Sequence, residues 1–286
     1  MNLQETIDLT ADSASDHEAR TAQVGSGTRQ RGGKKSKKRI RAIGQFIRGH
    51  IAGNATRSNF SVGHLRDAAR LQSDNSTIVL CSPETQLFNS TAASRGWACG
   101  YRNCQMLISS LLSAPGGSRL SIDNVPSVSE LQHMLESAWA AGFDPDGAQQ
   151  LNHRVSGTRK WIGATEVYCI LAHLGIHAHI VDFHHPTGAD GTHPGLFAYV
   201  VNYFTSGPGT GGAGGSNTMR FTEKHPLYLQ HQGHSRTIIG VELAPSATCL
   251  LVLDPDLGVA PAELQISMFR LPLADTRRAT QYQLVY

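Results

Sequence analysis

The chain has 286 residues, 40% of them hydrophobic, which is enough for one packed domain of about 200 residues and a tail. Its net charge of +3 is concentrated in residues 1–41, with nine Lys or Arg against five Asp or Glu, whereas the other 16 basic and 17 acidic residues nearly cancel. Because the body is near neutral, we expect nucleic acid to bind only through the basic tail, if at all. No apolar run approaches the roughly 18 residues of a membrane span, so we expect no membrane association.

The cysteines indicate a reduced protein with free thiols. There are five, an odd number, without any CxxC pair, and the polar, acidic N-terminus is unlike a signal peptide. A zinc site built on cysteine is therefore not expected, and we expect neither a metal nor a cofactor.

Residues 1–41 are rich in Ser, Thr, Gly and charge and poor in aromatic residues, which predicts a disordered tail. Within it, Ile7-Asp8-Leu9-Thr10 is a β-prone patch followed by acids, and it resembles a SUMO-interacting motif, although a chance match is the alternative. Residues 29–41 hold eight basic residues, which favours a nuclear localisation or nucleic-acid-binding segment over a merely solvated tail. We expect a nuclear or nucleocytoplasmic protein.

A helical segment is expected over residues 42–75. Isoleucines recur around its start at steps of three and four, the spacing of one helix face, at Ile40, Ile43, Ile47 and Ile51. Gly53-Asn54 is a plausible stop, and a second short helix is expected over 63–71.

The body, residues 76–286, is expected to open with a strand at 77–80. Helices are then expected over 105–112, 126–141 and 165–174, and Ser127 and Glu130 have the spacing of a capping box. Strands are expected over 178–183, 197–204, 227–230, 237–243 and 249–253. Helices first and strands later predict an α+β fold with helices packed on a mainly antiparallel sheet.

Cys99 has the setting of a nucleophile. A loop containing Gly96 delivers it to the start of an apolar helical run, where free N–H groups and the helix dipole stabilise a thiolate. Gly100 leaves room for a substrate backbone, and Trp97 could wall a cleft. The alternative is a small buried hydrophobic residue, as expected for Cys104, Cys169 and Cys249.

His234 and Asp254 complete a possible triad. His234 follows a glycine at the mouth of a strand, and Asp254 ends an apolar strand 20 residues later. Two neighbouring antiparallel strands could bring them together, and the aspartate would then fix the histidine tautomer. The order Cys, His, Asp is the papain arrangement. His184-His185 is interpreted as a loop pair.

Three separated motifs resemble one family. Residues 96–107, GWACGYRNCQML, resemble the GWGCGYRN-x-QML signature of the ubiquitin-fold-modifier-specific peptidases, with Ala98 in place of Gly. Residues 161–166, WIGATE, and 230–237, QHQGHSRT, resemble the branch that contains the zinc-finger-containing ubiquitin peptidase. In that branch the histidine precedes the aspartate, as here, whereas the modifier-processing branch has a late Asp-Pro-His, and here Asp256 follows Asp-Pro.

The resemblance covers residues 76–286 and implies a papain-like fold, a Cys99–His234–Asp254 triad and deubiquitinase activity, which we expect on polyubiquitin chains. No zinc-finger pattern is present in the chain. The alternatives are a peptidase for the ubiquitin-fold modifier itself, a catalytically inactive binding module, and a transglutaminase-like acyl transferase.

The substrate would need two further sets of groups. The backbone of Cys99 is one candidate oxyanion donor, and Gln86 or Asn89 could supply the other. The ubiquitin tail is rich in Arg and Gly, so a narrow cleft with carboxylates is expected, with Glu166 and Asp144 as candidates beside Trp97. Glu166 could instead be an acid at a helix N-terminus.

Overall fold

The computed structural model describes residues 6–7, 57–66, 75–115, 120–206, 218–257 and 264–286. The basic run at 29–41, the isoleucine stripe at 40–51 and all of the expected SUMO-interacting motif except Ile7 lie outside these residues. Within them, no helix is long and apolar enough to cross a membrane.

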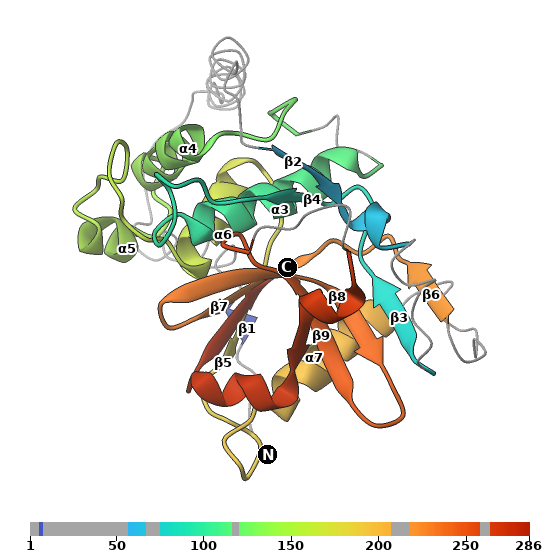
Figure 1. Ribbon diagram of the computed structural model, residues 1–286. Helices are drawn as coiled ribbons and strands as arrows, with labels where there is room; N and C mark the ends of the chain where they lie inside the picture. The colour runs from blue at the N-terminus through green and yellow to red at the C-terminus, as the bar shows by residue number, and fades with distance from the viewer. Residues whose placement is uncertain (1–5, 8–56, 67–74, 116–119, 207–217, 258–263) are drawn as a thin grey trace, which may run out of the picture.

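A nine-stranded sheet forms the centre of the described structure, and Figure 1 shows it below the helices α3 (Cys99–Ser113), α4 (Val128–Ala140) and α6 (Ala164–His173). Every pairing in it is antiparallel except that of β3 with β6. The path runs β1 (Thr6–Ile7), β5 (Ile180–Phe183), β11 (Tyr282–Val285), β7 (Leu227–His231), β8 (His234–Leu243), β3 (Thr77–Leu80) and β6 (Thr218–Phe221); β9 (Thr248–Leu253) pairs with β8, and β10 (Arg270–Pro272) pairs with β9. A separate two-stranded ladder joins β2 (Arg57–Ser61) to β4 (Gln86–Phe88).

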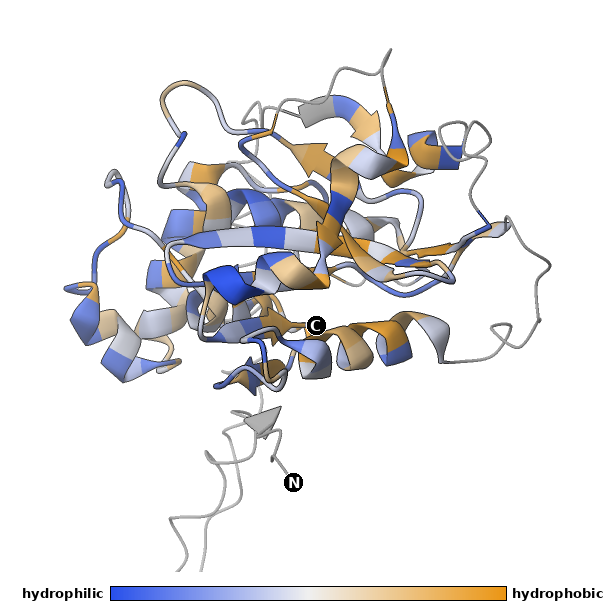
Figure 2. Ribbon diagram, turned by 60° about the horizontal axis from the view of Figure 1, so that its bottom comes forward, coloured by the Kyte–Doolittle hydropathy of each residue, from blue (hydrophilic) through white to orange (hydrophobic). Residues whose placement is uncertain are grey.

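The helices belong to two cores. The described α-helices are α3 (Cys99–Ser113), α4 (Val128–Ala140), α5 (Pro145–Gln150), α6 (Ala164–His173) and α7 (Pro194–Thr205), and the 3-10 helices are η1 (Val62–His64), η4 (Ile266–Phe269) and η5 (Leu273–Arg278). One core joins α3, α4 and α6 to Ile180, Tyr228 and Val285 of the sheet. The other joins α7, the β2–β4 ladder and most of the remaining strands. Figure 2 shows hydrophobic residues along the central strands and on α7.

The predicted α+β fold with a mainly antiparallel sheet is confirmed, as are the main helices and five of the six expected strands. The capping box is also present: Ser127 Oγ accepts the Glu130 N–H at 3.2 Å, and Glu130 Oε2 accepts the Ser127 N–H at 2.7 Å.

Two element predictions were wrong. Residues 197–204 form part of the helix α7 and not a strand, because its apolar residues Leu196, Phe197, Val200 and Phe204 are buried with the spacing of one helix face. In the expected helical segment at 42–75, residues 57–61 form the strand β2, which pairs with β4. The strands β4, β6, β10 and β11 and the short helix α5 were not predicted.

Candidate active site

Cys99 is the first residue of α3 and is partly exposed. The chain reaches it through a turn at Gly96, whose φ of +80° is a conformation that L side chains rarely adopt. The next residue, Gly100, lies against the backbone of Ile162, since a Cβ at Gly100 would stand 2.5 Å from the Ile162 carbonyl oxygen. The glycine therefore lets the segment before α6 press against the start of α3, beside the thiol.

His234 and Asp254 meet at the ends of neighbouring strands. His234 opens β8 after a two-residue turn in which Gly233 has a φ of +80°, and Asp254 follows β9 directly. The His234 Nε2 lies 2.8 Å from the Asp254 Oδ2. The same oxygen accepts the Arg236 Nε–H at 2.8 Å, and the Asp254 Oδ1 accepts the backbone N–H of Asp256 at 3.0 Å. The carboxylate is thus held on both oxygens.

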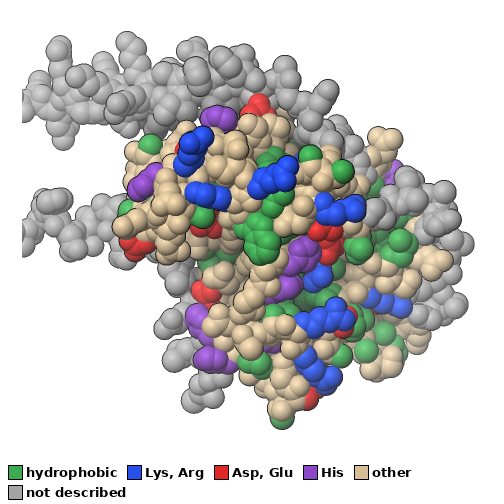
Figure 3. Space-filling view, turned by 60° about the vertical axis from the view of Figure 1, so that its left-hand side comes forward, with side chains coloured by type: hydrophobic (Ala, Val, Ile, Leu, Met, Phe, Trp, Pro, Cys, Tyr) green, Lys and Arg blue, Asp and Glu red, His purple; other side chains and the backbone are tan. Residues whose placement is uncertain are grey.

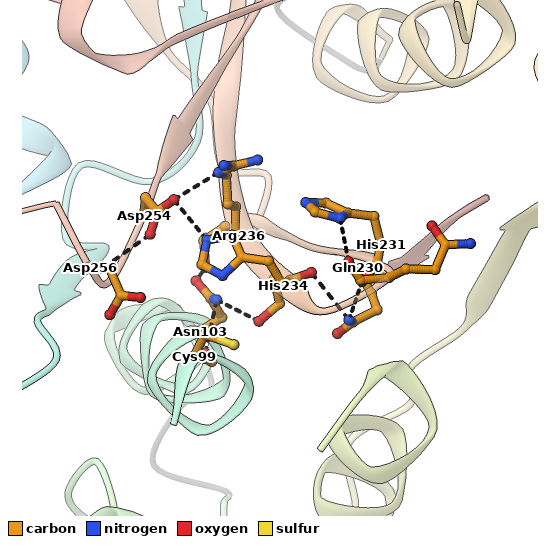
Figure 4. A network of polar contacts seen from close by, with 11 residues as sticks. Cys99, Asn103, Gln230, His231, His234, Arg236, Asp254 and Asp256 are labelled. Atoms are coloured by element: carbon orange, nitrogen blue, oxygen red, sulfur yellow. Dashed lines mark hydrogen bonds and ion pairs between the residues drawn. The ribbon is translucent and has the colours of Figure 1, made fainter. Parts of the chain in front are cut away.

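Cys99 lies on the other side of the imidazole, as Figure 4 shows, with His234 between it and Asp254. Because Nε2 faces Asp254, the other ring nitrogen, Nδ1, is left for the hydrogen bond with the Cys99 sulfur. Figure 3 shows histidine side chains at the surface in a hollowed part of one face, next to hydrophobic and Lys or Arg side chains. The structure thus brings the three predicted residues together in the order that the sequence predicts.

The ionisation of the three groups follows from these contacts. Burial raises the pKa of Cys99, but hydrogen bonds from His234 and Ser235 and the His234 charge outweigh it, so this pKa is lowered. The hydrogen bond with Asp254, and then that with Cys99, raises the pKa of His234 to about 9 against the effect of burial. Burial opposes the ionisation of Asp254, but the hydrogen bond and charge of His234 lead the contacts that hold its pKa at about 2. These shifts favour a thiolate–imidazolium pair backed by a carboxylate.

The other cysteines lack this setting. Burial raises the pKa of Cys81, Cys104 and Cys169 to about 12, and it also raises that of Cys249, a partly exposed residue on β9. Cys104 and Cys169 are buried in the core around α3, as the alternative for cysteine expects.

Of the two candidate oxyanion donors, Gln86 is not placed near the thiol. Its backbone N–H donates to Ser109 Oγ at 3.0 Å, and Ser109 lies ten residues beyond Cys99 on α3, about 15 Å along the helix axis. Asn89 lies nearer, since the N–H of its neighbour Ser90 donates to the Pro255 carbonyl at 2.8 Å, one residue from Asp254. The Asn89 Oδ1 is buried without a hydrogen-bond partner among the described residues.

The two predicted tail-binding carboxylates both cap helices. The Glu166 Oε2 accepts the Gly163 N–H at 2.7 Å at the start of α6, which is the helix N-terminal role weighed as the alternative. Asp144 caps α5 by accepting the Gly147 N–H at 3.0 Å, and its Oδ2 is buried without a partner among the described residues. Burial chiefly, and the negative charge of Asp144 in addition, raises the pKa of Glu166. The two acids therefore lie close enough to repel each other.

Two tryptophans stand near the site. Trp97 is half-buried, its indole N–H donates to the Ala93 carbonyl at 3.0 Å, and its ring meets Tyr101 edge-on. Trp161 is 55% exposed and lies over the turn before His234, where its ring would be 3.7 Å from a Cβ added to Gly233. Sequence reasoning named Trp97 and placed Trp161 in a motif without giving it a role.

Within the described residues, one group has the chemistry to hold a metal ion: the ligand atoms of His234, Asp254 and Asp256 lie within 4.8 Å of one another. The contacts inside the group account for its geometry, because the hydrogen bonds from His234, Arg236 and the Asp256 N–H already use both oxygens of Asp254. We assign no metal to it.

Comparisons with known proteins identify the family of the chain. The family model of peptidase family C78 matches residues 74–283. Zinc finger-containing ubiquitin peptidase 1 of Homo sapiens is 49% identical over 180 residues, covering 62% of this chain and 30% of the relative. Ubiquitin carboxyl-terminal hydrolase mug105 of Schizosaccharomyces pombe is 40% identical over 171 residues, covering 59% and 64%, and Ufm1-specific protease 1 of Mus musculus is 30% identical over 163 residues, covering 56% and 59%.

The matched part of this chain thus spans less than a third of the zinc-finger relative and less than two thirds of the other two. The family match covers most of the chain, includes Cys99, His234 and Asp254, and confirms the resemblance drawn from the three motifs. The chain belongs to peptidase family C78, and with it to the cysteine peptidases.

Proposed function

We propose that this protein is a thiol-dependent deubiquitinase that hydrolyses the peptide or isopeptide bond after the C-terminal glycine of ubiquitin, including bonds within polyubiquitin chains. The observation that carries the proposal is His234, bonded to Asp254 through Nε2 and facing the helix-start thiol of Cys99 with its other nitrogen. Ubiquitin is proposed as the substrate because two of the relatives compared bear ubiquitin-peptidase names.

In the first half of the reaction, the Cys99 thiolate attacks the carbonyl carbon of the terminal glycine and the carbonyl oxygen becomes an oxyanion. The His234 imidazolium then gives its proton to the leaving amine, and a thioester remains on Cys99. In the second half, neutral His234 takes a proton from water, the hydroxide attacks the thioester, and the acid product leaves the thiolate behind. Asp254 holds the ring and stabilises its charged form throughout.

The oxyanion needs donors that are in place before the reaction. The backbone N–H of Cys99 is one, because the first N–H groups of a helix have no partner within the helix. For the second we propose the side-chain amide of Asn89 over that of Gln86, since Asn89 lies beside the end of β9 whereas Gln86 lies along the far part of α3.

The tail of the modifier is proposed to run past Trp97 toward Glu166 and Asp144. Neither carboxylate is ion-paired with a Lys or Arg among the residues that the structure describes. Their mutual repulsion would be relieved by an arginine of the substrate, and a charge-assisted contact of this kind contributes roughly 1.5–3 kcal/mol.

Two other functions are less well supported. A peptidase for the ubiquitin-fold modifier would be expected to carry Asp-Pro-His, but Asp256 follows Asp254-Pro255, and the identity with Ufm1-specific protease 1 is 30% against 49% with the zinc-finger relative. An inactive binding module would not need the lowered thiol pKa of Cys99 or the hydrogen-bonded His234–Asp254 pair.

The experiment is a comparison of three C-terminally electrophilic probes built on ubiquitin, SUMO and the ubiquitin-fold modifier. We expect the ubiquitin probe to attach covalently to the protein and to Cys104→Ala, and not to Cys99→Ala. We also expect the parent protein to shorten polyubiquitin chains. Labelling by the ubiquitin-fold-modifier probe alone would overturn the choice of substrate, and labelling of Cys99→Ala but not of Cys104→Ala would overturn the choice of nucleophile.

A further inference from the structure

A buried polar cluster joins the helix that carries Cys99 to the strand that carries His234. Asn103, one turn after Cys99 on α3, donates from its Nδ2 both to the Cys99 carbonyl at 2.9 Å and to Ser235 Oγ at 2.9 Å. Its Oδ1 accepts the Thr237 hydroxyl at 2.8 Å. Asn103, Ser235 and Thr237 are all 0% exposed. We call these three residues the Asn103 clamp.

The clamp has only one arrangement that satisfies its polar atoms. Both Nδ2 protons of Asn103 are used, one on each element, and its carbonyl has a donor. Turning the amide over would set its oxygen against the Cys99 carbonyl oxygen, which cannot donate, and a buried unsatisfied group costs about 1–3 kcal/mol. The amide is thus fixed, and with it the distance between the start of α3 and the start of β8.

Because β8 is pleated, its neighbouring residues His234 and Ser235 point to opposite faces of the strand. Side chains alternate along a strand, so Ser235 and Thr237 share the face toward α3, while His234 and Arg236 share the face toward Asp254. Figure 4 shows His234 and Arg236 directed to Asp254, and Asn103 on the side of Cys99. One strand therefore offers the thiol a base from one face and a hydroxyl from the other.

The hydroxyl of Ser235 has a proton to give. Its oxygen accepts from Asn103, so its own proton is left for another acceptor. Ser235 lowers the pKa of both Cys99 and Tyr228, through its side chain and, for Cys99, also through its backbone N–H, so the Cys99 sulfur and the Tyr228 phenol oxygen are the two candidates. The Tyr228 O–H itself donates to Gln230 Oε1 at 2.7 Å. When Cys99 is a thiolate, it carries a full charge and is the stronger acceptor of the two.

Resting on the proposed function of this site, we propose that Ser235 is a further catalytic residue whose hydroxyl donates a hydrogen bond to the Cys99 thiolate, and that Asn103 is the positioning residue that holds this hydroxyl in place. No bond is made or broken by Ser235. It keeps the thiolate aligned for attack and shares with His234 the stabilisation of its charge. The signature of residues 96–107 contains Asn103, and the motif of residues 230–237 contains Ser235, so the clamp links two motifs that are far apart in the chain.

Other groups also face this thiolate and set its titration. His234 faces it from β8, with Asp254 and Arg236 behind the ring, and Tyr228 faces it from β7. The test must therefore change Ser235 while leaving these four in place.

The experiment measures how the alkylation rate of Cys99 by iodoacetamide depends on pH, with the Cys99 peptide followed by mass spectrometry. In Ser235→Ala we expect the midpoint of the rate to move up by about one pH unit, and kcat/KM on a ubiquitin–fluorophore substrate to fall by about tenfold, the scale of one hydrogen bond to a charged group. Thr237→Val, which frees the Asn103 carbonyl without touching sulfur, should move the midpoint in the same direction by less.

Ser110→Ala is the matched control. Like Ser235, Ser110 is a fully buried serine, but it lies on α3 eleven residues after Cys99 and is bonded to His225 Nδ1 at 3.0 Å. It should lower the melting temperature without moving the midpoint. A midpoint that stays in place in both Ser235→Ala and Thr237→Val would overturn the proposal. Alkylation needs no ubiquitin, so a shifted midpoint in a protein that cleaves no ubiquitin substrate would refute the proposed substrate and leave the role of Ser235 standing.

Discussion

The charge of His234 is set by two neighbouring groups of opposite sign, Asp254 and Arg236, which are bonded to each other. The Asp254 carboxylate, bonded to Nε2, stabilises the imidazolium, whereas the Arg236 guanidinium, bonded to the same oxygen, opposes it. Arg236 also helps to keep Asp254 ionised. The balance leaves the pKa of His234 at about 9, high enough for the ring to be charged beside a thiolate at neutral pH.

Removing the charge of Arg236 should extend activity to higher pH. The thiolate–imidazolium pair exists above the lowered pKa of Cys99 and below the His234 pKa of about 9, so the alkaline limb of activity reports the loss of the His234 proton. Because Arg236 lowers the pKa of His234, Arg236→Gln should move this limb upward by roughly one pH unit or less. Arg236→Lys, which keeps the charge, should stay close to the parent.

The measurement is kcat/KM on a ubiquitin–fluorophore substrate from about pH 5 to about pH 10.5, with circular dichroism at each pH to check the fold. An alkaline limb that stays in place or moves to lower pH in Arg236→Gln would contradict the assigned balance of charges.

Among the single residues of the site, those marked by a pattern of a few neighbouring residues could be predicted from the sequence. Those whose role depends on contacts between distant side chains could not. Cys99 could be found because a glycine-flanked cysteine before an apolar run is a pattern within a few residues. The roles of Asn103 and Ser235 could not, because their contact joins positions 132 residues apart. The sequence could not show whether Gln86 or Asn89 lies nearer to the thiol. Their spacing to Cys99 does not reveal that β4 places Gln86 beside Ser109, in the far part of α3.

Among the elements, α7 shows how composition can mislead. Its residues 197–204 are rich in aromatic and β-branched side chains, which favour strands, so a strand was predicted. Pro194, which suits the first turn of a helix, and a single buried stripe at Leu196, Phe197, Val200 and Phe204 decided the structure instead. The Tyr199 and Tyr203 rings on the same helix pack edge-on against Tyr286 near the end of the chain. Tertiary packing, which the sequence does not display, overrode the local preference.

The helix α6 positions the Glu166 carboxylate, which we expect to bind an arginine of the substrate tail. Glu166 is fixed at its first turn by the Gly163 N–H, so its removal would damage both the cap and the binding of a tail arginine. Glu166→Gln separates the two, because the amide oxygen still accepts the N–H while the charge is lost. We expect Glu166→Gln to lower kcat/KM on a ubiquitin tail by about tenfold with little change in melting temperature.

The charge exchange is the sharper test of this contact. A ubiquitin probe whose tail arginine is changed to glutamate should react poorly with the parent and regain reactivity with Glu166→Arg. A lost cap would slow both probes alike, so rescue of the altered probe alone identifies direct recognition. If Glu166→Arg reacts normally with the unaltered probe, Glu166 is a helix cap and the tail arginine is bound elsewhere.

Across the whole molecule, the site lies where the two cores meet. The start of α3 belongs to the core of α4 and α6, whereas β9, which delivers Asp254, belongs to the core of α7 and the outer strands. The strand β8 touches both, and the Asn103 clamp crosses from one side to the other. A shift of one core relative to the other would therefore move the start of α3 relative to Asp254.

We expect the N-terminal region to affect where the protein accumulates in the cell and not its catalytic activity. Residues 1–41 hold none of the triad, and the described body is near neutral, so the excess positive charge of the chain lies apart from the site. Of this region the structure describes only β1, which adds Thr6–Ile7 to the free edge of β5, at the far end of the sheet path from β3 and β6. Deleting residues 1–41 should thus leave kcat/KM on a small ubiquitin–fluorophore substrate nearly unchanged while reducing nuclear accumulation, because the eight basic residues of 29–41 are lost.

A second variant separates the basic run from the rest of the tail. Replacing the eight Lys and Arg of residues 29–41 with Gln keeps the length of the chain and the β1–β5 pairing, and it should reduce nuclear accumulation as much as the deletion does. Imaging of both variants as fluorescent fusions, with each one's ubiquitin–fluorophore kinetics measured in parallel, gives the comparison. If the substituted protein still concentrates in nuclei while the deleted one does not, the signal lies elsewhere in residues 1–41. If both remain nuclear, the basic run has no part in localisation, and a purely solvating role is left for it.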